Sequence, residues 1–393
     1  MEIFFWILIT LIIYTYIGYG IIVAFIVKLL GLDKKKNDEL AELPHVTLFV
    51  AAYNEKDFVD IKMKNSFELD YPKDKITFLW ITDGSNDGTP DLLRKYENVK
   101  VLHEDKRSGK TAAILRGINY VETSIIIFCD GNTLLNKETI KGVVKAFQDP
   151  KVGCVAGEKR IFKKDSDSAS GSGEGAYWKY ESVLKKLDSA LYSAVGGVGE
   201  IFALRKELFE PVETDTLLDD FVITLKIAMK GYKIKYVPEA TAYETPSDNV
   251  EEELKRKIRI SAGGYQAIER LSPLLNPFKH GILSLQFWSR KVLRWVFVPY
   301  AFLILFPLNL YLAYTVNFES THYLTIIFYL QIFFYLIILI GKLLANKNIK
   351  FKAVFLPYYI FIMNYAAILG SWRYFKGNQS VNWERAKRRE MSA

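Results

Sequence analysis

Cysteine is nearly absent from this sequence. The chain has 393 residues and only two cysteines, Cys129 and Cys154. Both fall in short apolar runs that predict buried strands. We therefore expect them to be small core residues of a protein in a reducing compartment, and not a disulfide.

Two ligand-binding signatures are also missing. No Gly-x-Gly-x-x-Gly follows the first predicted strand, which excludes the dinucleotide fingerprint of nicotinamide-dependent enzymes. The soluble part has no basic stripe interleaved with aromatic residues, which excludes a nucleic-acid partner. The formal net charge is a moderate +8, and basic residues cluster at 290–294 and 385–389, beside apolar stretches. Such clusters suit anionic lipid headgroups.

Charged residues are absent from four long stretches. Residues 3–27, 295–318, 320–341 and 353–372 contain no Asp, Glu, Lys or Arg. A helix needs about 20 apolar residues to cross the hydrocarbon core of a bilayer, so each stretch is a candidate span. The segment between the first and second stretches is charged and mixed. The sequence thus predicts an integral membrane protein that contacts the lipid bilayer and carries a soluble domain after its first span.

The composition divides the chain into five parts. We expect an N-terminal transmembrane helix at 1–30, a cytoplasmic domain at 31–272, an interfacial helix region at 273–294, transmembrane helices at 295–375 and a basic tail at 376–393. Glu2 lies where a signal peptide would be basic, and no small-residue cleavage site follows, so an uncleaved anchor is favoured. Lys28 and Lys34 to Lys36 after this anchor place the domain in the cytoplasm, at the inner membrane if the source is bacterial.

The basic tail conflicts with four full spans. With the domain inside, four spans would leave the carboxyl terminus outside, yet residues 373–389 are strongly basic and such segments stay in the cytoplasm. We expect a cytoplasmic tail. Either residues 353–372 are re-entrant or interfacial, or an interfacial helix near 274–288 shifts the number of spans.

Short β-rich runs alternate with helical segments in the soluble part. Residues 46–52, 76–81 and 125–129 are almost continuously apolar, as in parallel strands covered on both faces. Helical patterns at 109–120 and 136–148 separate the strands, so the fold class is α/β with a mostly parallel sheet. Residues 165–175, rich in Gly and Ser, predict a loop. Residues 232–243 alternate like an antiparallel strand.

Three aspartates follow apolar residues in separate acidic motifs. Asp83, Asp130 and Asp220 stand in Ile-Thr-Asp-Gly-Ser, Phe-Cys-Asp-Gly-Asn and Leu-Leu-Asp-Asp-Phe. Carboxylates at the carboxyl ends of strands in an open α/β sheet converge on one crevice. Taken alone, Asp130-Gly131-Asn132 is typical of an ordinary turn. The residues around Asp83 resemble a calcium-binding loop, but no Glu stands at the position that closes such a loop.

The order and spacing of the motifs over residues 45–260 resemble the family 2 glycosyltransferases, which have a Rossmann-like GT-A fold. The matching pieces are Ala51 to Glu55, Thr82 to Thr89, Lys106 to Lys110, Asp130 to Asn132 and Asp219-Asp220. With its flanking apolar stretches, the chain resembles the membrane-embedded hyaluronan, chitin-oligosaccharide, cellulose and poly-N-acetylglucosamine synthases. The resemblance implies a GT-A domain inserted between transmembrane helices.

The resemblance also implies roles for particular residues. Asp83 would contact the uracil of a UDP-sugar, and Ala52, Asn54 and Glu55 would line the base pocket. Asp130 and Asn132 would bind Mg²⁺ or Mn²⁺ at the diphosphate, near Lys110. Asp220 occupies the general-base position, and one carboxylate base with direct displacement implies inversion. The acceptor or diphosphate region would contain Asp219, Gly199, Glu200, Arg256 and Arg259.

One motif departs from the processive members of the family. They carry Gln-x-x-Arg-Trp, whose Trp stacks on the acceptor sugar, whereas this chain has Arg256 to Ile260, with Arg259 kept and Ile260 in place of Trp. Tyr265 or Trp178 is a candidate substitute. We expect transfer to a growing envelope or extracellular glycan, with single transfer to a polyprenyl-phosphate or other lipid-linked acceptor as the alternative. A partner that binds nucleotide without catalysis is the third hypothesis, and the oligomeric state stays open.

Overall fold

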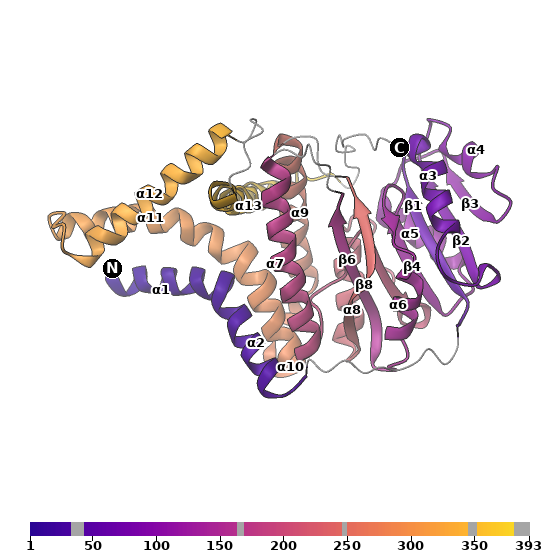
Figure 1. The fold of residues 1–393 in the computed structure, drawn as a ribbon, viewed down its shortest axis with the longest axis horizontal. Helices are drawn as coiled ribbons and strands as arrows, with labels where there is room; N and C mark the ends of the chain where they lie inside the picture. The colour runs from indigo at the N-terminus through magenta and orange to yellow at the C-terminus, as the bar shows by residue number, and fades with distance from the viewer. Residues whose placement is uncertain (33–42, 163–168, 246–249, 345–351, 381–393) are drawn as a thin grey trace.

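A computed structural model describes residues 1–32, 43–162, 169–245, 250–344 and 352–380. The predictions that rest on Lys34 to Lys36 and on the tail beyond residue 380 lie outside these ranges. Within them, an α/β domain occupies one end of the molecule, and apolar helices extend from its other end (Figure 1). The layout places the first apolar helix at the N-terminus and three more toward the C-terminus.

The domain is built on a mixed eight-stranded sheet with the order β3-β2-β1-β4-β7-β6-β8-β5. Its strands are β1 Val46–Ala52, β2 Ile76–Asp83, β3 Val99–Glu104, β4 Ile125–Asp130, β5 Leu134–Leu135, β6 Val152–Ile161, β7 Ile201–Arg205 and β8 Lys233–Glu244. Strands β1, β2, β3 and β4 pair in parallel, whereas β7 runs antiparallel to β4 and β6. The sheet is therefore mixed, with its parallel half around β1.

Helices cover both faces of the sheet, which explains the continuous hydrophobicity of β1 and β2. Phe49 and Leu79 face one core, with α5 (Lys110–Gly117) and α8 (Asp219–Met229). Leu48 and Phe78, one residue away on each strand, face the other core, with α3 (Lys56–Phe67) and α6 (Thr139–Ala146). Successive side chains of a strand point to opposite faces, so a strand between two cores is apolar throughout.

Within the described residues, four helices are long and apolar enough to cross a membrane. They span Glu2–Leu29, Pro277–Thr315, Tyr323–Leu344 and Val354–Phe375. The first comprises α1 (Glu2–Ile13), a π-helical turn η1 (Tyr14–Gly18) and α2 (Tyr19–Leu29), and the second comprises α10 (Pro277–Phe287), a π-helical stretch η6 (Trp288–Phe297) and α11 (Val298–Thr315). The other two are α12 (Tyr323–Leu344) and α13 (Lys352–Phe375). Four apolar helices are thus confirmed.

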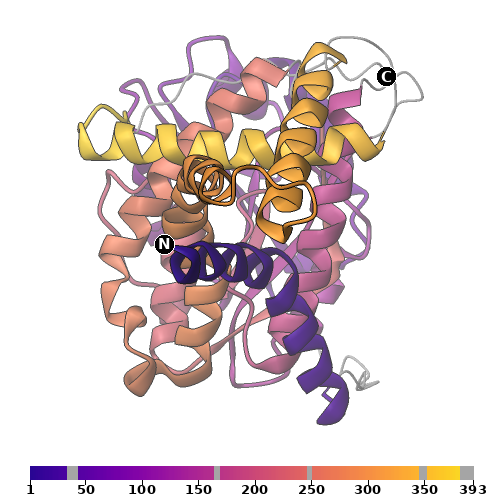
Figure 2. The ribbon, with the colours of Figure 1, turned by 90° about the vertical axis from the view of Figure 1, so that its left-hand side faces the viewer.

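The apolar helices are not separate from the domain. Helix α2 packs on α7 (Ala169–Leu191) through Val23, Val27 and Leu184. Helix α13 lies against α9 (Val250–Arg270), and a Cβ on Gly370 would come within 2.5 Å of the Ser261 Cβ. Figure 2 shows α13 lying crosswise, with α12 passing in front of it. The domain is therefore not simply inserted between spans, because helices from both parts share one packed layer.

Two local predictions were wrong. The Gly- and Ser-rich segment was expected to be a loop, but α7 begins at Ala169, and only residues 163–168 of that region lie outside the described structure. The alternating segment 232–243 forms β8, which pairs in parallel with β6 and is antiparallel only to the two-residue strand β5. Period-two alternation reports how the faces of a strand are buried, and not the direction of its neighbour.

Candidate active site

The loops at the carboxyl ends of β1, β2 and β4 open into a cavity of about 1300 Å³. The cavity also receives the start of α8, the middle of α9, η6 and α13. Twelve of the sequence-predicted residues share its wall: Ala52, Glu55, Asp83, Lys110, Asp130, Asn132, Gly199, Glu200, Asp219, Asp220, Arg256 and Arg259. Parallel strands bring these separate motifs together because their carboxyl ends meet at one edge.

Asp83 is the last residue of β2, and one of its two carboxylate oxygens accepts hydrogen bonds. Its Oδ2 accepts hydrogen bonds from the backbone N–H groups of Ser108 at 2.9 Å and Gly109 at 2.7 Å. Its Oδ1 is buried and has no hydrogen-bond partner among the described residues, and the nearest cation is Arg116 at 3.6 Å. Gly84 has a φ of +72°, and a Cβ there would meet Arg107 at 2.6 Å, so this turn requires glycine. One carboxylate oxygen is thus held in place and the other is left for a ligand.

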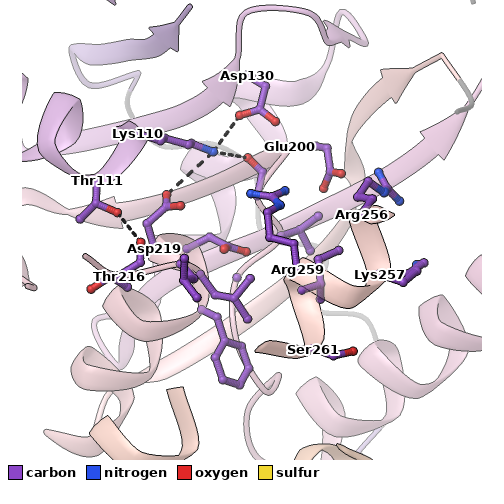
Figure 3. Close-up of a pocket in the computed structure, with 18 of the residues that line it drawn as sticks. Lys110, Thr111, Asp130, Glu200, Thr216, Asp219, Arg256, Lys257, Arg259 and Ser261 are labelled. Atoms are coloured by element: carbon purple, nitrogen blue, oxygen red, sulfur yellow. Dashed lines mark hydrogen bonds and ion pairs between the residues drawn. The ribbon is translucent and has the colours of Figure 1, made fainter. Parts of the chain in front are cut away.

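Lys110 joins the motifs of β4 and α8 at the first turn of α5. Its Nζ donates to the Asp130 carboxylate at 2.7 Å, lies 3.4 Å from the Gly199 carbonyl and 3.8 Å from Asp219 Oδ2. Figure 3 shows the lysine between these groups. Burial opposes the charge of Lys110, but the carboxylates of Asp130 and Asp219 outweigh it and raise its pKa. The oxygen atoms at this end of the cavity thus already surround one positive charge, the ammonium group of Lys110.

Asp220 lies in the first turn of α8, opposite the loop of residues 196–200. A Cβ on Gly199 would lie 3.7 Å from its carboxylate, so this glycine leaves open space beside the acid. Burial, and then the neighbouring charge of Asp219, raise the pKa of Asp220 to about 7. The N-terminal position on the helix favours a carboxylate, yet desolvation dominates. Asp220 is therefore poised to accept a proton near neutral pH.

The two arginines of α9 that line the cavity differ in their surroundings. Arg256 lies 3.5 Å from Glu244 and 3.2 Å from Glu253, within a charged group at the end of β8. Arg259, one turn further along, points toward the space beside Asp130 and Asp219 (Figure 3). A guanidinium in this direction suits an anionic group held near Lys110.

The oxygen donors fit a hard divalent cation. Asp130 and Asn132 both line the cavity, and the buried Asp219 Oδ2 has no hydrogen-bond partner among the described residues. No group of three or more His, Cys, Asp or Glu residues that could hold a metal occurs in the described ranges. Mg²⁺ commonly takes one or two protein oxygens and completes its shell with phosphate oxygens and water, so two side chains are sufficient.

Two predicted positions lie away from the cavity wall. Asn54 has a φ of 51°, and its side chain exchanges hydrogen bonds with Asn86, at 3.1 Å and 3.0 Å, so it joins two loops behind the wall. Tyr265 is buried and donates to the Trp295 carbonyl at 3.1 Å. Trp178, the other candidate aromatic platform, does line the cavity.

The sequence reasoning missed a second group of wall residues. Glu181 and Lys185 of α7 and Arg290, Lys291 and Arg294 of η6 line the part of the cavity nearest the apolar helices. The basic residues near 290 were noticed and assigned to lipid headgroups, because nothing in the sequence indicates that η6 packs against α7.

Comparisons with known proteins agree with this geometry. The model of glycosyl transferase family 2 matches residues 47–212. The poly-beta-1,6-N-acetyl-D-glucosamine synthase of Staphylococcus aureus strain MSSA476 is 29% identical over 250 residues, which cover 61% of this chain and 59% of that protein. This match thus spans less than two thirds of the relative's length. The synthase of the same name from Staphylococcus epidermidis is 24% identical over 353 residues, 84% of each chain.

Among solved structures, a mannosyltransferase from Pyrobaculum calidifontis in complex with GDP-Man and Mn²⁺ has the same fold. The two chains superpose with a TM-score of 0.68 at 22% identity, covering 94% of this chain and 98% of the other. The sheet is thus GT-A-like, as the motifs implied. Together, the family match and the related synthases identify residues 47–212 as a glycosyl transferase family 2 domain.

Proposed function

We propose that the protein is a membrane-integral, inverting glycosyltransferase that transfers a sugar from a UDP-sugar to a growing glycan. The observation that carries this proposal is that Asp83, Asp130 and Asp220, from three separate segments, line one cavity. The nucleoside requires a hydrogen-bond acceptor, which the open Oδ1 atom of Asp83 offers. The diphosphate requires a bound cation, which Asp130 can hold. The acceptor hydroxyl requires a base, which is the carboxylate of Asp220 with its raised pKa.

Each group would do one part of the reaction. The Oδ1 atom of Asp83 accepts a hydrogen bond from the base of the donor. Lys110 and Arg259 balance the charge of the diphosphate as the bond to the anomeric carbon breaks. Asp220 takes the proton of the acceptor hydroxyl as its oxygen attacks from the opposite face, so an α-linked donor gives a β-linked product.

Asp130 and Asn132 would hold Mg²⁺ or Mn²⁺. When bound, such an ion neutralises negative charge that develops on the diphosphate leaving group. Lys110 lies 2.7 Å from Asp130, so the lysine and the ion would share this carboxylate. The same contact keeps the Asp130 side chain directed into the cavity.

The helices favour a particular membrane arrangement. In Figure 1, α1 and α11 extend away from the sheet, whereas α13 is seen end-on, and α13 lies crosswise in Figure 2. The apolar window of α13 is 44% buried within the protein, against 22% for Glu2–Leu29. We infer that α1, α11 and α12 span the bilayer and that α13 is interfacial, with the domain and the C-terminus in the cytoplasm. Three spans remove the conflict with the basic tail. Labelling of Ser380→Cys by an impermeant thiol reagent added outside intact cells would contradict this arrangement.

Transfer of one sugar to a lipid-linked acceptor is the second candidate function. The observation in its favour is that the cavity wall reaches Tyr16 of η1 and Asn364 of α13, among the apolar helices. Product length separates the two candidates. Membranes incubated with labelled UDP-sugars give a polymer in the first case and a single glycolipid in the second.

The general base gives the direct test of catalysis. Asp220→Asn removes the proton acceptor and keeps the shape, so we expect sugar transfer to fall by about 10²- to 10⁴-fold. UDP binding should stay close to that of the unmodified protein. The control is Asp91→Asn, whose side chain is 78% exposed and lies far from the cavity. Unchanged turnover in Asp220→Asn would remove this residue from the mechanism, and a wild-type protein that binds UDP but cleaves no UDP-sugar would favour a non-catalytic partner.

A further inference from the structure

The part of the cavity lined by α7 and η6 carries four basic side chains, Lys185, Arg290, Lys291 and Arg294, which we call the basic end. They come from α7 and η6, which are far apart in the sequence. Residues of η6 and α13 also line the cavity. None of the four residues belongs to the donor motifs.

Two carboxylates neutralise only part of this charge. Arg290 lies 2.8 Å from Glu181 and 2.8 Å from Asp188, and Arg294 also pairs with Glu181. Among the described residues, Glu181 and Asp188 form the ion pairs within 4 Å of these four side chains, whereas Glu158 and Glu200 act on Lys185 without forming such a pair. Lys185 Nζ is buried and has no hydrogen-bond partner in the part of the chain that the structure describes. Burial lowers the pKa of Lys185, although the carboxylates of Glu158, Glu181 and Glu200 oppose this shift.

Aromatic rings do not account for these lysines. Lys185 Nζ lies 5.5 Å from the ring centre of Trp178, and Lys291 Nζ lies 5.0 Å from Phe221 and 5.1 Å from Trp295. A cation–π contact stabilises a buried charge far less than a counter-ion does. A purely structural cluster would have gained stability from apolar residues at these positions. An excess of buried positive charge beside a cavity instead favours an anionic ligand.

The basic end lies between the general base and the apolar helices. Lys291 contacts Phe221, the residue that follows Asp220. On the other side, Arg294 lies 5.5 Å from the ring of Tyr16, whose hydroxyl accepts a hydrogen bond from Asn364 at 2.8 Å. A molecule bound here would have its anionic group at η6, one end near Asp220 and the other among helices that are apolar enough to meet lipid.

We propose that the basic end binds the phosphate or diphosphate of a lipid-linked acceptor and thereby presents the acceptor's sugar hydroxyl to Asp220. This inference rests on the proposed function and specifies its acceptor. A neutral glycan would bring no counter-charge to Lys185 and Lys291. In the reaction, the acceptor hydroxyl oxygen bonds to the anomeric carbon, its proton passes to Asp220, and the bond to the donor diphosphate breaks with UDP taking the electron pair.

Binding can be measured without catalysis. The full-length protein in phosphatidylcholine nanodiscs is heated with undecaprenyl phosphate, with undecaprenol or with inorganic phosphate. We expect undecaprenyl phosphate to raise the unfolding temperature, undecaprenol to leave it unchanged, and inorganic phosphate to act only at much higher concentration. Equal effects of the phosphate and the alcohol would overturn the proposal, and so would the absence of any effect. An equal response to inorganic phosphate would assign the site to a soluble phosphorylated acceptor.

Two variants test the residues separately. Lys185→Gln and Lys291→Gln each remove one charge, and loss of a charged hydrogen bond to phosphate should weaken undecaprenyl phosphate binding by about 10- to 100-fold. The matched control is Lys186→Gln, because Lys186 is the neighbouring residue on α7 and is exposed. Wild-type affinity in both cavity variants would contradict the proposal.

The same samples distinguish failure of this inference from failure of the proposed function. Donor cleavage is followed as UDP release with a UDP-sugar panel. If UDP release is lost in Asp220→Asn but does not respond to phosphate lipids, the proposed glycosyltransferase activity stands and only the proposed acceptor site is overturned. In the expected result, Lys291→Gln raises the KM for the lipid acceptor and leaves the KM for the UDP-sugar unchanged.

Discussion

The two ends of the cavity are built in opposite ways. The acidic end, around Asp83, Asp130 and Asp220, consists of loops at strand ends and the first turn of α8, whereas the basic end consists of side chains from the long helix α7 and from η6. Each end leaves a buried polar atom without a hydrogen-bond partner among the described residues, namely Asp83 Oδ1 and Lys185 Nζ. Natural proteins satisfy most such atoms, so each of the two ends is a candidate position for a ligand.

The largest expected effect of a substitution at the basic end is a loss in the free energy of unfolding. Arg290→Met would leave Asp188 and Glu181 buried without their main partner, and breaking a buried ion pair costs about 3–5 kcal/mol. Lys291→Gln breaks no ion pair between described residues and should cost far less. Chemical unfolding in detergent measures both variants. Equal losses would contradict the view that Arg290 stabilises the fold while Lys291 serves a ligand.

A smaller effect is expected at the acidic end. Asp83→Asn keeps the shape but weakens the hydrogen bonds from Ser108 and Gly109 and the contact with the donor base. Loss of charge at one such hydrogen bond corresponds to about 1.5–3 kcal/mol, or a roughly 10- to 100-fold increase in the Kd for UDP. Isothermal titration with UDP measures this change. An unchanged Kd would remove Asp83 from the donor site, and the same variant should bind undecaprenyl phosphate normally.

The smallest expected effect is a shift in pH dependence. Asp220 acts as a base only when ionised, and its pKa of about 7 means that kcat/KM should fall as the pH drops below about 7. Asp219→Asn removes the like charge that helps to raise this pKa, so the acidic limb should move to lower pH. The pH profile of UDP release measures both proteins. If the acidic side of the pH profile lies at the same pH in Asp219→Asn as in the wild type, Asp219 does not influence the titrating group.

The same contrast explains how much could be predicted from the sequence. Asp83 and Asp130 were predictable because an apolar run followed by an acidic turn is a local pattern, and parallel pairing brings strand ends together. The basic end was not, because Arg290 and Glu181 are 109 residues apart and their contact depends on helix packing. Helix α7 was missed in part because Gly and Ser disfavour isolated helices, whereas packing against α2 and α13 stabilises this one.

The direction of β8 was also beyond the sequence pattern. Its alternating residues indicate that one face is buried and the other polar, but the parallel pairing with β6 depends on the connection through α8 and on the antiparallel insertion of β7. Likewise, Ile260 indicated only that the usual aromatic platform is lost. That Trp178 and not Tyr265 reaches the cavity followed from the packing of α7 and α9.

The central claim is that acidic residues from separate segments bind one sugar donor together with a divalent cation. Titration of the purified protein with UDP, with and without Mn²⁺, tests it most directly, using the wild type and Asp130→Asn. We predict that Mn²⁺ strengthens UDP binding to the wild type at least tenfold and that Asp130→Asn loses most of this gain. Equal affinity for UDP with and without Mn²⁺ in both proteins would contradict the account.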